Sequence, residues 1–121
     1  MPYPTPRTNR GMSASPRRGE VWWVALDPAQ GSEIQKARPC IVLTSDIVNA
    51  RRRTVVVVPL SSAPRESPPL LIGLSSVGRP AVAVLDQLRV VAKERLREKL
   101  GDVAPAELGA IEDGLREILE L

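Results

Sequence analysis

The stretch GEVWWVALDPAQGSEIQKARPCIVLT, residues 19–44, contains two apolar runs separated by a polar segment. In the first run, residues 20–27, apolar side chains fall on both alternating faces, which is typical of a strand buried on both sides. The second run, residues 40–44, follows Pro39, whose missing N–H suits the start of a strand. Residues 28–37 between them are predicted to form a loop, so the stretch predicts two strands joined by a polar connection.

The rest of the chain continues as short strands and closes with a helix. Further strands are predicted at residues 54–58, 70–74, 81–85 and 88–92. Short helices are predicted at residues 45–50 and 93–100. A final helix is predicted from Pro105, with an apolar stripe at Leu108, Ile111, Leu115, Ile118 and Leu119. This pattern favours a mainly β fold, either a small barrel or a half-open sheet.

The length of 121 residues predicts one domain. Residues 1–18 hold four prolines and four arginines without an acid, and are predicted to be a disordered basic tail before a single folded domain at residues 19–121. The N-terminus has no apolar signal-peptide core, and no run approaches the roughly 20 apolar residues of a membrane span. The expected location is the cytoplasm, with no membrane partner.

Charge is distributed unevenly along the chain. The formal net charge is +3, yet residues 36–65 hold six basic side chains against the single acid Asp46. A local excess of this kind fits a polyanionic partner, and it equally fits a solvated charged face.

The chain has no histidine and one cysteine, Cys40. A Ser-His-Asp triad, a Cys-His pair and a His-ligated metal site are therefore excluded. Cys40 lies in an apolar run and is predicted to be a buried, unreactive thiol. The acids near the strands are too scattered to predict a metal site, so neither a metal nor another cofactor is expected.

Three polar groups at strand ends and loops suit a reaction on RNA. The ribose 2′-hydroxyl is an internal nucleophile beside its own phosphate. The guanidinium of Arg38 can grip phosphate oxygens in a bidentate way, the Ser61 hydroxyl can add a hydrogen bond, and Glu33 can accept a proton or orient the arginine. Taken singly, each has a simpler explanation as a surface charge, a turn cap or a solvated carboxylate.

The arrangement as a whole resembles the MazF/PemK family of toxin endoribonucleases across residues 19–121. The segments that carry the resemblance, in chain order, are RGEVW (18–22), DP (27–28), GSE (31–33), RP (38–39), VVPLS (57–61) and LDQL (85–88). The order and spacing match over most of the chain, whereas any one segment alone would be weak.

The resemblance implies an SH3-like, MazF/CcdB-type small β-barrel with a C-terminal helix, acting as a homodimer. It implies sequence-specific, metal-independent cleavage of single-stranded RNA that leaves a 2′,3′-cyclic phosphate and a 5′-hydroxyl. It also implies a cognate MazE-like antitoxin that covers the RNA groove.

The family's active-site residues fall on Arg38, Ser61 and Glu33, with serine where the family usually has threonine. Ser62 is the alternative hydroxyl if the register differs by one. The residues expected to contact RNA are Gln35, Lys36, Arg51, Arg52, Ser62, Arg65, Asp86 and Gln87. Of the two tryptophans, Trp22 and Trp23, one must face the core.

Two other functions remain open at this point. A CcdB-like toxin on the same barrel would poison a protein target such as gyrase without cleaving RNA. A non-catalytic RNA-binding module would bind RNA in a salt-dependent way without forming products.

Overall fold

A computed structural model describes residues 15–26, 37–62 and 65–121 of the chain. The predicted loop at residues 28–37 lies almost entirely outside the described residues. The elements in chain order are β1 (Glu20–Ala25), β2 (Ala37–Val42), α1 (Asp46–Arg51), β3 (Thr54–Ser61), β4 (Leu71–Leu74), β5 (Ala81–Val84), the 3-10 turn η1 (Leu85–Gln87), β6 (Arg89–Ala92), the 3-10 turn η2 (Lys93–Arg95), β7 (Leu96–Asp102) and α2 (Pro105–Leu119).

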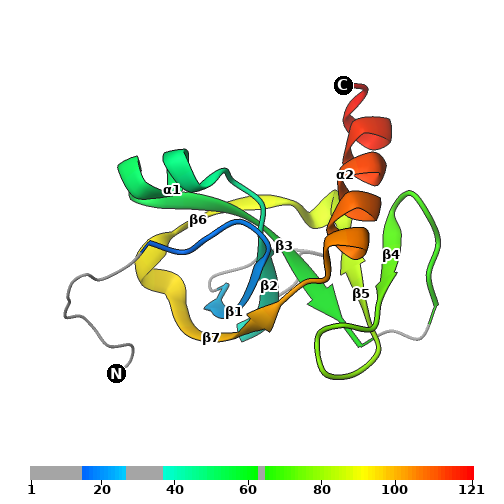
Figure 1. The fold of residues 1–121 in the computed structure, drawn as a ribbon, viewed down its shortest axis with the longest axis horizontal. Coiled ribbons are helices and arrows are strands. Elements are labelled where there is room, and N and C mark those ends of the chain that lie inside the picture. Colours follow the sequence, from blue (N-terminus) through cyan, green and yellow to red (C-terminus); the bar gives the residue numbers. More distant parts are fainter. Residues whose placement is uncertain (1–14, 27–36, 63–64) are drawn as a thin grey trace.

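The described strands form one antiparallel sheet with β3 at its centre (Figure 1). The order is β4-β5-β3-β2-β1-β7, and β6 also pairs with β3. Along one edge, β3 pairs with β6 from Thr54 to Val57 and with β5 at Leu60 and Ser61. The sheet curls without closing, which confirms the predicted mainly β, barrel-like fold with a C-terminal helix.

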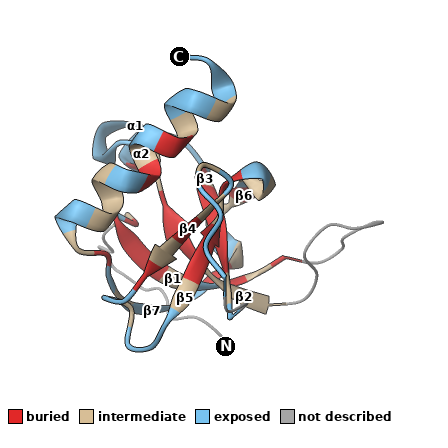
Figure 2. Cartoon of the chain, turned by 90° about the vertical axis from the view of Figure 1, so that its right-hand side faces the viewer, coloured by how far each residue is buried: buried red, intermediate tan, exposed pale blue. Residues whose placement is uncertain are grey.

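Strand β3 is buried on both faces, whereas β1, for which the sequence predicted this, leaves Trp23 40% exposed. On β3, Val55 and Val57 pack into one hydrophobic cluster, while Val58 and Leu60 pack into a second cluster. The second cluster also receives Ile111 from α2. Figure 2 shows the buried residues running along the strands and along the side of α2 that faces them. Valine suits these positions because its branched side chain packs well on a pleated surface.

Helix α2 begins with Pro105 at its first position, as predicted, and docks on the sheet through Leu108, Ile111, Leu115 and Ile118. Leu119, predicted as part of the same stripe, is 48% exposed. Gly114 is buried where the helix approaches η1 and the start of β4 most closely. A Cβ at Gly114 would lie 2.6 Å from Leu85 Cδ1 and 3.1 Å from the Pro69 carbonyl oxygen, whereas a Cβ at Gly109 would meet nothing within 4 Å. The close contact with the sheet therefore requires a glycine at position 114 but not at position 109.

The prediction of a short helix at residues 93–100 is wrong. Only the 3-10 turn η2 forms there, and the remaining residues belong to β7, which pairs with β1. The segment LREKLGD favours a helix by composition, but its pairing with β1 overrides that preference. Two register irregularities in this pairing and four consecutive exposed residues, Arg97 to Leu100, hide the period-two signal of a strand.

Strand β3 is longer than predicted, β2 is shifted toward the N-terminus and ends at Val42, and both contain a proline. Strand β2 begins at Ala37, so Pro39 lies inside it rather than at its start. Strand β3 runs to Ser61 through Pro59. Pro59 falls between the residues that pair with β6 and those that pair with β5. A missing N–H is tolerated at this point because β3 changes partners there.

Two residues that the sequence assigned to the tail are bonded to the folded body. The Arg17 guanidinium lies 3.0 Å from Asp46, and Arg18 donates hydrogen bonds to the Leu43 carbonyl oxygen and the Glu112 carboxylate. The body therefore extends at least to Arg17.

In the described parts of the chain, no helix is long and apolar enough to cross a bilayer.

Candidate active site

The antiparallel register of β2 and β3 brings Arg38 and Ser61 together. Cys40 pairs with Pro59, Ile41 with Val58, and Val42 with Val57. The same register continued by two residues sets Arg38 opposite Ser61, at the beginning of one strand and the end of the other. Directly opposite residues in an antiparallel pair project to the same face, with Cβ atoms about 5 Å apart. Two residues separated by 23 positions in the chain therefore meet at one end of this pair of strands.

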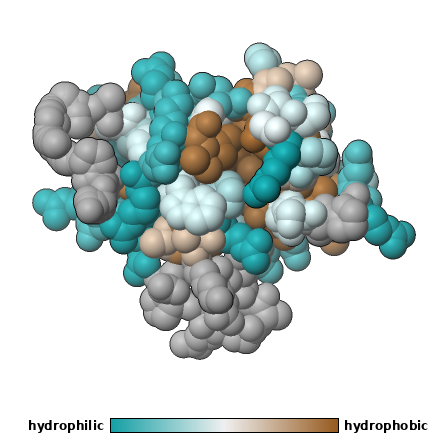
Figure 3. All heavy atoms as spheres, turned by 90° about the horizontal axis from the view of Figure 1, so that it is seen from below, coloured by the Kyte–Doolittle hydropathy of each residue, from teal (hydrophilic) through white to brown (hydrophobic). Residues whose placement is uncertain are grey.

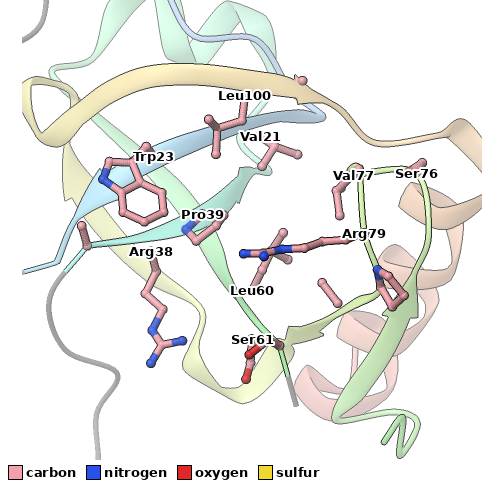
Figure 4. A pocket seen from close by; sticks show the side chains of 16 residues that line it. Val21, Trp23, Arg38, Pro39, Leu60, Ser61, Ser76, Val77, Arg79 and Leu100 are labelled. Atoms are coloured by element: carbon pink, nitrogen blue, oxygen red, sulfur yellow. The ribbon is translucent and has the colours of Figure 1, made fainter. Parts of the chain in front are cut away.

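Both side chains line a single pocket of about 750 Å³. In Figure 4, Arg38 and Ser61 point to the same side, away from Pro39 and Leu60. Both are half-buried, so they are neither enclosed in the core nor fully in solvent. Val21, Trp23, Pro39 and Leu60 supply the apolar part of the lining.

A second guanidinium, that of Arg79, belongs to the same pocket. Figure 4 shows it reaching over Leu60 toward Pro39 from the loop that connects β4 and β5. No carboxylate lines the pocket among the residues that the structure describes. The sequence analysis missed Arg79. The dipeptide Arg79-Pro80 repeats Arg38-Pro39, and this repetition was the available signal.

The two tryptophans divide between the core and the pocket, as expected. Trp22 packs against the cluster that contains Val57, and its Nε1 donates a hydrogen bond of 2.9 Å to the Glu20 carboxylate. Trp23 is 40% exposed, pairs with Pro39 of β2 and lines the pocket. Its ring is therefore available to stack on an aromatic ligand such as a nucleobase.

Cys40 lies two residues after Arg38 in β2, and its side chain is buried. Burial raises the pKa of its thiol to about 12, although the nearby charges of Arg89 and Arg38 oppose this shift. The thiol is therefore protonated at neutral pH and is not a nucleophile, in agreement with the sequence-based expectation.

Of the residues predicted to contact RNA, only some lie at this pocket. Ser62 lines it, next to Ser61. Arg51 and Arg52 lie near the opposite end of β3, whose eight residues span about 23 Å. They cannot contact the same phosphate as Ser61. The basic stretch at residues 36–65 is therefore not a single patch.

Arg65, Asp86 and Gln87 do not line the pocket either; Arg65 and Asp86 are exposed, and Gln87 is half-buried in η1. Glu33, Gln35 and Lys36 lie outside the described residues. Over residues 15–26, 37–62 and 65–121, no group of three or more His, Cys, Asp or Glu is placed to hold a metal ion.

Figure 3 views the molecule from below, the side where β7 and the loop between β4 and β5 lie in Figure 1. Apolar surface near the middle of this face is bordered by hydrophilic side chains. This combination suits a ligand that has both charged and planar apolar parts.

Comparison with known proteins finds relatives that match most of the chain. Residues 17–119 match the family described as the PemK-like, MazF-like toxin of type II toxin-antitoxin systems. The endoribonuclease MazF9 of Mycobacterium tuberculosis is 37% identical over 114 residues, covering 87% of this chain and 97% of the relative. The endoribonuclease toxin MazF of Escherichia coli is 35% identical over 97 residues, covering 79% of this chain and 86% of the relative.

Solved structures show the same fold. A crystal structure of MazF from Deinococcus radiodurans superposes with a TM-score of 0.81 at 22% identity, covering 90% of this chain and all of that chain. A mycobacterial endoribonuclease in complex with its cognate antitoxin superposes with a TM-score of 0.72 at 24% identity, over 88% of this chain and 95% of that chain. By its sequence match from residue 17 to 119, and with a fold that agrees, this chain belongs to the PemK-like, MazF-like toxins of type II toxin-antitoxin systems.

Proposed function

We propose that the chain is an endoribonuclease toxin that cleaves single-stranded RNA in the pocket between Arg38 and Ser61. The observation that carries this proposal is that the two side chains share one face and one pocket, at the strand ends where their register meets. A second guanidinium, Arg79, lies in the same pocket, and an exposed tryptophan lies beside it. Phosphates and bases of RNA match these two kinds of group.

The proposed reaction uses the substrate's own 2′-hydroxyl as the nucleophile. Its oxygen forms a bond to the adjacent phosphorus while the bond to the 5′-oxygen of the next nucleotide breaks, giving a 2′,3′-cyclic phosphate. The departing 5′-oxygen takes a proton from water and becomes the 5′-hydroxyl. Arg38 stabilises the charge that develops on the non-bridging oxygens, and the Ser61 hydroxyl adds a hydrogen bond to it. Glu33, which precedes β2 in the chain, is the proposed acceptor of the 2′-hydroxyl proton.

The proposal includes the biological setting of the family. The relatives named above are endoribonucleases, and a mycobacterial relative is solved with its cognate antitoxin. We expect a MazE-like antitoxin to neutralise this chain by covering the pocket. We also expect a homodimer in the cytoplasm, where RNA is available, with cleavage at a short specific sequence and without a metal.

The test is cleavage of a long single-stranded RNA by the purified chain in the presence of EDTA, with the 5′ ends of the fragments sequenced. Wild type is expected to give fragments with 5′-hydroxyl ends at a recurring short sequence. Arg38→Ala is expected to lower the cleavage rate by about 100-fold or more, because it removes a donor that acts on the developing charge. Ser61→Ala is expected to lower it by at least about tenfold. Ser61→Thr is expected to keep activity, since threonine retains the hydroxyl.

Two controls make the result specific. Arg116→Ala removes an exposed guanidinium on α2 that lies outside the pocket lining, and it is expected to leave cleavage unchanged. Ser62→Ala separates the two neighbouring hydroxyls. Full activity of folded Arg38→Ala would overturn the assignment of the site. RNA binding without any product would favour a non-catalytic module, and capture of gyrase without cleavage would favour a protein-poisoning toxin.

A further inference from the structure

One wall of the pocket is formed by the loop between β4 and β5. Residues 75–80 connect β4 to β5, and five of them line the pocket: Ser76, Val77, Gly78, Arg79 and Pro80. Gly78 has φ +98°, which allows the chain to turn sharply just before Arg79. Arg79 itself is exposed, and within the described residues no hydrogen bond or ion pair holds its guanidinium. Its position over the pocket therefore depends on the backbone of the loop.

The backbone of this loop is held by Glu107, in the first turn of α2. One carboxylate oxygen, Oε2, accepts hydrogen bonds from the Ser75 backbone N–H at 2.7 Å and from the Ser75 hydroxyl at 3.1 Å. The other oxygen, Oε1, accepts hydrogen bonds from the Ser76 backbone N–H at 3.2 Å and from the Ser76 hydroxyl. A single side chain thus satisfies four donors on two consecutive loop residues.

Two further contacts complete the attachment of the loop. The Ser76 hydroxyl accepts a hydrogen bond of 3.0 Å from the Ala104 backbone N–H, just before α2. Val77 packs against the hydrophobic cluster under the helix. Arg79 lies two residues beyond Val77, so the attached part of the loop ends immediately before the guanidinium that enters the pocket.

The four bonds require a carboxylate. Both oxygens of a carboxylate accept, whereas a glutamine amide offers one accepting oxygen and an NH₂ group that can only donate. Burial disfavours ionisation of Glu107, but the hydrogen bonds from Ser76 and Ser75 outweigh it and lower the pKa of the carboxyl below its ordinary value. The group is therefore ionised throughout the neutral range and complements the two backbone amides.

We propose that Glu107 is a positioning residue of the nuclease site: it fixes the loop at residues 75–80 so that the Arg79 guanidinium is held over Leu60 in the pocket, where it faces a phosphate of the substrate. This inference rests on the proposed function. Glu107 does not line the pocket, and its contact with the lining is through Ser76. Its influence on the reaction passes through the loop and Arg79.

The test compares Glu107→Gln with Glu117→Gln, which makes the same chemical change at an exposed position further along α2. Hydrogen exchange at residues 75–80 is expected to become faster in Glu107→Gln and to remain unchanged in Glu117→Gln. Cleavage of single-stranded RNA is expected to fall about tenfold in kcat/KM for Glu107→Gln, the size expected when a hydrogen bond to a charged group is lost. Far-UV circular dichroism and the melting temperature check that both variants remain folded.

A double mutant separates positioning from general stability. In an Arg79→Ala background, Glu107→Gln is expected to change kcat/KM less than twofold, because the group through which it acts is gone. The same tenfold loss in both backgrounds, or unchanged exchange of the loop in Glu107→Gln, would overturn the inference. If the wild-type chain cleaves no RNA, the proposed function fails, and the exchange experiment still decides whether Glu107 holds the loop.

Discussion

The two glycines of α2 allow a matched test of how the helix docks. Gly109→Ala and Gly114→Ala make the same substitution five residues apart in one helix. Alanine gains about 1 kcal/mol of helix propensity over glycine at either position. At Gly109 a new methyl group meets no atom within 4 Å, so we expect the free energy of unfolding to rise by about 1 kcal/mol.

At Gly114 the same gain is opposed by overlap. The new Cβ would lie 2.6 Å from Leu85 Cδ1, which can move, and 3.1 Å from the Pro69 carbonyl oxygen, which belongs to the backbone. Overpacking of this kind costs about 1–3 kcal/mol. Set against the propensity gain, the change at Gly114 is expected to lie between about 0 and −2 kcal/mol. Gly114→Ala should therefore be at least about 1 kcal/mol less stable than Gly109→Ala.

Urea or thermal unfolding of the two variants beside wild type measures the difference. About 1 kcal/mol corresponds to a shift of roughly 4–8 °C in melting temperature for a domain of this size. We expect Gly109→Ala to melt above wild type and Gly114→Ala at or below it. If Gly114→Ala were stabilised as much as Gly109→Ala, the close approach of α2 to Leu85 and Pro69 would be refuted.

Three further predictions concern titratable groups. The buried Cys40 thiol, with its pKa raised to about 12, should react with a thiol reagent only after unfolding; rapid labelling of the native chain at neutral pH would contradict this. Because the folded-state pKa of Glu107 is lowered, its contribution to stability is present above the unfolded pKa and is lost as pH falls through the folded value. Glu107→Gln should therefore flatten the stability profile on the acid side of pH 4.5, as acid-titration melts would show. A hydrogen bond to Glu20 raises the pKa of Lys99. The pair therefore stabilises the fold below pH 10.5, and this contribution is lost as pH rises through the folded-state pKa of Lys99. Lys99→Met should remove this dependence of stability on alkaline pH, as melts above about pH 9.5 would show.

The sequence predicted those strands whose own residues are apolar at nearly every position. β1 and β3 are apolar on both alternating faces, and that pattern is independent of their neighbours. β7 could not be predicted in this way. Its exposed residues Arg97 to Leu100 have no alternation, and its conformation follows from pairing with β1 and from the contacts of Lys99 with Glu20 and Asp102. These partners lie far away in the chain or depend on the register.

The sequence analysis also predicted only some residues of the candidate site. The family resemblance named Arg38 and Ser61, but the predicted strands, residues 40–44 and 54–58, stopped short of both. The observed strands extend to these residues, and their antiparallel register sets the two opposite each other. Arg79 and Glu107 lie in a loop and a helix whose contact depends on how α2 docks. A glutamate at the third position of a helix usually serves its own N-terminus, so its bonds to a distant loop leave no mark in the sequence.

The double burial of the central strands explains why the polar groups lie at their ends. Along β3, residues 55, 57, 58 and 60 are occupied by valine and leucine because both faces of the sheet are covered. A charged or hydroxyl side chain in that interval would lose its water without a partner, at a cost of a few kcal/mol. At Ala37–Pro39 and at Ser61 the cover ends and the side chains become half-buried. The strand ends can therefore hold Arg38 and Ser61 rigidly while leaving both groups open to a ligand, and the loop that Glu107 holds brings Arg79 to the same opening.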